Sequence, residues 1–147
     1  MIINKVGIDL HGVIDSNIDL FKMLLENFYY LNVEVHIISG PPVVDIKQEL
    51  NEYGLKEDLH YKFIYSVVDY LKSKNIPMWL GKEGTWWAGD EYWWGAKAEI
   101  CYYKNIDIML DDSKRYKPDF EKIKTKFILY NNIFKSKSER LVNEDVR

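Results

Sequence analysis

Residues 2–15 read IINKVGIDLHGVID and join an apolar strand to a carboxylate and a turn. Val6 and Ile8 alternate along the run from Ile2 to Asp9, a pattern typical of a β-strand. Ligands of open parallel sheets bind at the carboxyl ends of the strands, where loops line the edge. Asp9 is therefore predicted to lie at a binding edge, to which later strands should bring further polar groups.

The composition is that of an ordinary globular chain. Its 147 residues, 47% hydrophobic and 29% charged, predict one domain over residues 1–147 with a sizeable core. A net charge of -3 and the absence of a long Lys/Arg run argue against extended nucleic acid as a partner. Cys101 is the single cysteine, and no leader or long apolar span is evident, so we expect a cytoplasmic protein without a membrane partner.

Strand and helix patterns alternate along most of the chain. Apolar residues recur at helical spacing over residues 16–31, 42–54, 67–74 and 96–104. Strand patterns follow the first strand at residues 33–39, 61–66, 106–110 and 126–130. Parallel neighbours need a crossover connection, so this order predicts an α/β three-layer sandwich with a five-stranded parallel sheet.

The alternation fails between residues 75 and 95, which hold all five tryptophans and four glycines and are predicted to form an inserted hairpin or flap. The tryptophans are Trp79, Trp86, Trp87, Trp93 and Trp94. Their rings either cover the sheet or pack in a homo-oligomer contact, or they stack on a nucleobase or another partner. The polar tail, residues 131–147, is expected on the surface.

Several polar side chains follow predicted strands or begin the helix before one. They are Asp9, Ser39, Lys97, Asp111 and Asp112. Each alone is explained as a cap, a turn residue or a solvated charge. Together, however, carboxylates that converge at one edge repel one another, and a hard cation with oxygen ligands is the natural means of keeping them ionised.

The order of these motifs resembles the haloacid dehalogenase (HAD) superfamily. The motifs are Asp9-Leu10-His11-Gly12-Val13, Ser39, Lys97 and Asp111-Asp112. The resemblance implies a HAD-like Rossmannoid fold and an uncapped or minimally capped magnesium-dependent phosphatase, acting on a small phosphorylated substrate, with nucleotides among the candidates. It further implies that Asp9 is the nucleophile that forms an aspartyl-phosphate. Ser39 would then hold the phosphoryl group, and Lys97 would neutralise it.

The resemblance also implies a Mg²⁺ site. Its ligands would be the Asp9 carboxylate, the backbone carbonyl of His11 and Asp111, with Asp112 in support. His11 is the departure from the family pattern, which has a second aspartate there as general acid and base. Imidazole can perform that chemistry near neutral pH, but the bulkier ring puts efficient turnover in question.

Three alternatives stay open from the sequence. The first alternative is that the chain is a non-catalytic or weakly active HAD-like binding protein, in which His11 marks lost turnover and the tryptophans hold a partner. The second alternative is a phosphoacceptor switch resembling a response-regulator receiver. In that fold, however, the acidic pair is expected after the first strand, whereas here it follows the fourth. The third alternative concerns the site lysine, for which Lys104, nearer the fourth strand, and Lys82 are candidates besides Lys97.

Overall fold

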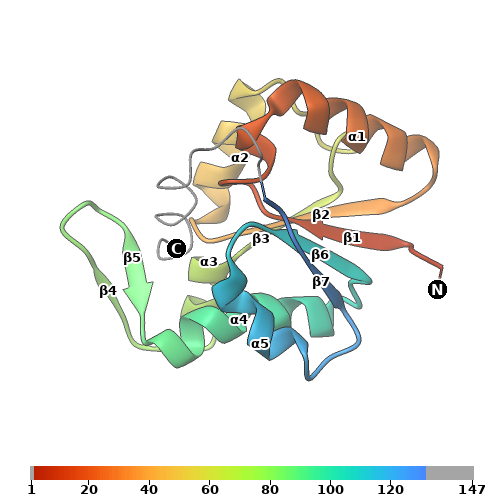
Figure 1. Ribbon diagram of the computed structural model, residues 1–147. Coiled ribbons are helices and arrows are strands. Elements are labelled where there is room, and N and C mark those ends of the chain that lie inside the picture. Colours follow the sequence, from red (N-terminus) through yellow and green to blue (C-terminus); the bar gives the residue numbers. More distant parts are fainter. Residues whose placement is uncertain (1, 132–147) are drawn as a thin grey trace.

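Strands and helices alternate through the computed structural model, which describes residues 2–131. The strands are β1 (Lys5–Ile8), β2 (Glu34–Ser39), β3 (Phe63–Ser66), β4 (Met78–Leu80), β5 (Trp86–Ala88), β6 (Ile108–Asp111) and β7 (Lys126–Leu129). The helices are α1 (Ile18–Tyr30), α2 (Val43–Glu52), α3 (Val67–Ser73), α4 (Asp90–Tyr103) and α5 (Lys117–Phe120), with short 3-10 turns η1 (Ile14–Ser16) and η2 (Lys114–Tyr116). Figure 1 shows their arrangement in space.

The main sheet has five strands in the order β3-β2-β1-β6-β7, and all neighbouring pairs are parallel. The predicted α/β fold with a five-stranded parallel sheet is therefore confirmed. The strand β1 is central: its Ile8 pairs with Ile37 of β2 on one side and with Leu110 of β6 on the other. This register brings the ends of three strands to the same edge of the sheet.

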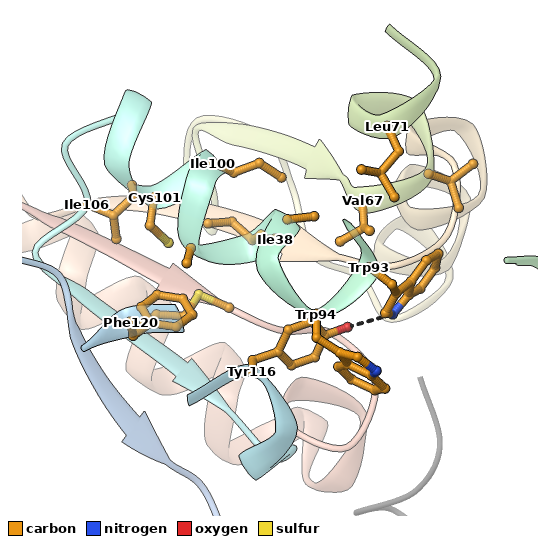
Figure 2. Packing of buried hydrophobic residues seen from close by; sticks show 14 of the residues in the cluster. Ile38, Val67, Leu71, Trp93, Trp94, Ile100, Cys101, Ile106, Tyr116 and Phe120 are labelled. Carbon is orange, nitrogen blue, oxygen red and sulfur yellow. Dashed lines mark hydrogen bonds between the residues drawn. The ribbon is translucent and has the colours of Figure 1, made fainter. Parts of the chain in front are cut away.

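Helices cover both faces of the sheet, which makes three layers (Figure 1). One core cluster combines alternate strand residues such as Ile8 and Ile37 with α1 and α2, through residues such as Leu25 and Leu50. The other cluster joins the opposite face to α3, α4 and α5 (Figure 2). Because successive side chains of a strand point to opposite faces, the period-two pattern of β1 and β2 separates the two cores.

Side-chain caps begin the helices α1 and α3. Asn17 accepts a hydrogen bond from the Leu20 N–H at 3.2 Å and begins α1. Ser66 accepts from the Asp69 N–H at 3.0 Å and begins α3 directly after β3. Such caps satisfy N–H groups that have no partner inside a helix.

The tryptophan-rich stretch is divided between two elements, so its prediction as one flap over residues 75–95 is wrong at its carboxyl-terminal end. The antiparallel hairpin contains β4 and β5 only, and α4 begins at Asp90 instead of Ala96. Trp93 and Trp94 are therefore helical and buried, at 2% and 7% exposure. An acidic first turn stabilises a helix N-terminus, so Asp90 helps α4 to begin directly after the hairpin.

Within residues 2–131, every helix is too short or too polar to cross a membrane. Apart from its first residue, the predicted polar tail lies outside the described residues.

Candidate active site

Two carboxylates lie side by side where β1 and β6 end. The Asp9 N–H donates to the Leu110 carbonyl at 3.0 Å and so continues the pairing of the two strands by one residue. Asp9 is 6% exposed and Asp111 is fully buried. Side chains alternate between the two faces of a strand, so Asp9 and Asp111 fall on the same face as Met109, which packs against α4.

Lys97 of α4 lies between these two acids. Its Nζ is 3.2 Å from Asp9 Oδ1 and 2.6 Å from Asp111 Oδ2, and its side chain is buried. Lys104, the alternative lysine, is exposed at the end of α4, with its Nζ 5.3 Å from the centre of the Tyr65 ring. Lys82 is exposed between the two strands of the hairpin. Lys97 is therefore the candidate that contacts the acidic pair.

Burial and charge shift the proton equilibria of these groups. Burial alone would lower the pKa of Lys97, but the carboxylates of Asp111 and Asp9 outweigh it and hold that pKa well above its usual value. For Asp111, burial and then the charge of Asp9 raise the pKa of the carboxyl, although Lys97 opposes them. One lysine thus only partly compensates the acids, and a further cation would favour their ionised forms.

A third carboxylate completes a set of possible metal ligands. Asp9, Asp111 and Asp112 each offer an oxygen, and these oxygens lie within 4.8 Å of one another. The Ser113 N–H donates to Asp111 Oδ1 at 2.9 Å and orients that carboxylate. Gly12, with φ +84°, is so close that an added Cβ would overlap the Asp112 carboxylate. The glycine of the first motif therefore makes room for an acid of the last.

The side chain of His11 is engaged by α2. Its Nε2 lies 2.8 and 3.0 Å from the two carboxylate oxygens of Glu49, and the Tyr53 hydroxyl donates to Glu49 Oε2 at 3.2 Å. About 42% of the His11 side chain is exposed. Glu49 was not among the predicted site residues, because a glutamate on a helix carries no signal of its partner. The metal-binding role of the His11 carbonyl stays a prediction.

Ser39 ends β2 and is 1% exposed. The pairing of Ile8 with Ile37 places Ser39 at the same edge of the sheet as Asp9. The turn that follows Ser39 is held in place by the Val43 N–H, which donates to Asp69 Oδ2 at 2.9 Å. The structure thus brings the predicted phosphate-holding residue to the edge that carries the acids.

Two aromatic residues connect Lys97 to the tryptophan-rich segment. The Lys97 Nζ is 4.4 Å from the centre of the Tyr116 ring. The Tyr116 hydroxyl accepts a hydrogen bond from Trp93 Nε1 at 3.1 Å (Figure 2). Burial raises the pKa of Tyr116, so its hydroxyl stays neutral. Tyr116 was not among the predicted site residues, because a tyrosine five residues after Asp111, the acidic end of β6, gives little signal by itself.

Comparisons with known proteins bear on the fold. No protein-family model and no curated protein sequence matches this chain. Its structure is similar to the crystal structure of an uncharacterized protein from Corynebacterium glutamicum, with a TM-score of 0.54 and 14% sequence identity. The similarity covers 99% of this chain and 97% of that one. At this identity the likeness is one of fold, and it accords with the α/β architecture described above.

Proposed function

We propose that the chain is a HAD-type phosphomonoester hydrolase that requires Mg²⁺ and uses Asp9 as its nucleophile. The observation that carries the proposal is the convergence of Lys97 with Asp9 and Asp111 at one sheet edge, at 3.2 and 2.6 Å. Such a set of charges suits phosphoryl transfer, in which positioning and charge stabilisation supply most of the rate.

In the proposed reaction, a carboxylate oxygen of Asp9 attacks phosphorus and the bond from phosphorus to the leaving oxygen breaks. The leaving oxygen takes a proton from a general acid, for which His11 is the candidate. Water then attacks the phosphorus of the aspartyl-phosphate, the bond from phosphorus to the Asp9 oxygen breaks, and a proton of the water returns to His11. This step releases inorganic phosphate and restores the Asp9 carboxylate. The Leu10 N–H, 2.9 Å from Asp9 Oδ1, and Lys97 fix the orientation of the nucleophile.

The residues present fit a magnesium ion. Three carboxylates with oxygens within 4.8 Å of one another form the all-oxygen donor set that this hard cation prefers. The raised pKa of the Asp111 carboxyl, caused first by burial and then by Asp9, supports the need for a further positive charge there. Asp9, Asp111 and Asp112 would hold the ion, which when bound offsets charge on the phosphoryl group.

The test is metal-dependent hydrolysis of an aryl phosphate by the purified chain. We expect release of phosphate with Mg²⁺, none after chelation with EDTA, and none from Asp9→Asn, which keeps the shape of the side chain but removes the nucleophilic charge. Asp19→Asn, at an aspartate in the first turn of α1, is the matched control and should leave the rate unchanged. Equal rates for the two variants would contradict the proposal.

A second candidate is a HAD-like binding protein with little or no turnover. It is favoured by one contact: the His11 imidazole pairs with Glu49 at 2.8 Å, where the family pattern has an aspartate two residues after the nucleophile. This candidate predicts that Mg²⁺ raises the melting temperature of the chain while every phosphate ester tested remains intact.

A further inference from the structure

A cavity of about 240 Å³ lies directly beyond Ser39, between the turn that follows β2 and the tip of the β4–β5 hairpin. Its lining residues are Gly40, Pro41, Pro42, Asp45, Val68, Gly84, Thr85, Trp86 and Trp93. Figure 1 shows the hairpin on the side of the molecule to which the strands of the sheet point. The cavity is therefore at the same edge as the acids.

The cavity is also connected to the acids through side chains. Trp93, one wall of the cavity, hydrogen-bonds Tyr116, and the Tyr116 ring lies against the ammonium of Lys97. Gly40 forms the adjoining wall, where an added Cβ would lie 3.3 Å from the Trp93 ring. Gly40, the residue after Ser39, lines this cavity, so a phosphate held at Ser39 would have the rest of its molecule close to it.

The walls suit a flat ring. Trp86, which is partly exposed, supplies an indole surface, and the two prolines add apolar contact. Trp93 and Val68, each 2% exposed, line the cavity only with the small part of their surface that is not buried. Lys72 holds the Trp86 indole, with its Nζ 3.8 Å from the ring centre, but does not line the cavity. This contact orients Trp86 and leaves another part of its surface toward the cavity. Stacking on aromatic side chains is the common means of binding a nucleobase.

The polar groups of the cavity favour a base over a second anion. Asp45 offers a carboxylate that accepts hydrogen bonds, and Thr85 offers a hydroxyl. Among the described residues that line the cavity there is no lysine or arginine to bind another phosphate. The occupant should therefore be uncharged, flat and equipped with an N–H donor.

We propose that this cavity binds the base of a nucleoside monophosphate, with the base stacked on Trp86 and an N–H group donating to Asp45. The proposal rests on the proposed function for the position of the phosphate. The volume, below the 300–1,000 Å³ typical of ligand pockets, makes a single-ring base the best probe.

The test compares uridine monophosphate with ribose phosphate, which has the same sugar and phosphate but no base. We expect kcat/KM to be about tenfold higher for the nucleotide, a difference within the range of one stacked base. Trp86→Leu should remove this advantage, so that kcat/KM for the two substrates becomes equal. The matched control is Trp79→Leu, in the other hairpin strand and 53% exposed, which should keep the advantage.

The outcomes separate this inference from the proposed hydrolysis. Hydrolysis that requires Asp9 but treats both substrates alike would overturn the base-binding cavity and leave the phosphatase standing. If no ester is hydrolysed, equilibrium dialysis of radiolabelled uridine decides: binding lost in Trp86→Leu and kept in Trp79→Leu supports the cavity, and absence of binding overturns it.

Discussion

Replacement of Lys97 by methionine tests how strongly the candidate site depends on its buried cation. The lysine is 2% exposed and contacts both Asp9 and Asp111, of which the second is fully buried. Methionine fills a similar volume but removes the charge. The two carboxylates would then face each other inside the protein without the ammonium that now lies between them.

The expected loss of stability follows from this burial. Breaking a buried ion pair by removing one partner costs about 3–5 kcal/mol, because an uncompensated charge remains inside. For a chain of this length, each kcal/mol lowers the melting temperature by about 2–4 °C. Lys97→Met should therefore lower the melting temperature by roughly 6–20 °C, through the same two conversions.

The loss of stability in Lys97→Met should also depend on pH. Burial and the charge of Asp9 raise the pKa of the Asp111 carboxyl, and without Lys97 only the hydrogen bond from the Ser113 N–H still opposes them. The folded variant then binds protons more tightly than the unfolded chain, so its stability rises as pH falls. The deficit relative to the unmodified protein should be smaller at about pH 5 than at about pH 8.

Urea denaturation followed by circular dichroism at both pH values measures these effects. Lys104→Met, at the exposed end of the same helix, is the matched control and should cost less than about 1 kcal/mol, as surface charges generally do. Equal losses of stability in the two variants would contradict this prediction. So would a loss of stability in Lys97→Met that grows as pH falls.

Three further substitutions address other parts of the site and core. Gly12→Ala should destabilise the folded protein by about 1–2 kcal/mol, because residue 12 has a left-handed backbone conformation. The added Cβ would also overlap Asp112, so the rise in melting temperature produced by Mg²⁺ should become smaller. An unchanged magnesium shift would argue against Asp112 as a ligand. His11→Asp should raise aryl phosphate hydrolysis, since it restores a carboxyl group at the acid–base position, and a rate equal to or below that of the unmodified chain would count against this role. Burial lowers the pKa of His36 although Glu34 opposes it, so the unfolded chain binds more protons and stability is lost as pH falls through 6.5. His36→Phe should flatten that loss in urea denaturation, and an unaltered slope would refute the assignment.

Much of the fold could be predicted from local pattern. Alternation of apolar residues in β1 and β2, interrupted by helical spacing, indicated parallel strands with crossovers, and the sheet confirms it. The ends of the strands were less well defined: β1 begins at Lys5, three residues after the predicted start at Ile2. A hydrophobic pattern identifies a strand better than it locates the ends of that strand, because the residues just outside a strand can have the same composition as those within it.

The tryptophan-rich segment shows where local pattern fails. Glycines and aromatic residues predicted a loop or hairpin up to residue 95, yet Trp93 and Trp94 belong to a helix. Their packing in the core, with the Trp93 indole donating to Tyr116, stabilises a helical conformation that aromatic propensity alone does not favour. Tertiary contacts therefore outweighed the local preference.

The sequence by itself determined that strands alternate with helices and that Asp9, Ser39 and Asp111 end strands of one parallel sheet, because these features depend on periodicity. Only the tertiary structure decided that Lys97, rather than Lys104, reaches the acids, and that His11 pairs with Glu49. Those contacts join residues far apart along the chain through the direction of side chains on packed helices. One-dimensional spacing does not specify that direction, whereas burial against the sheet does.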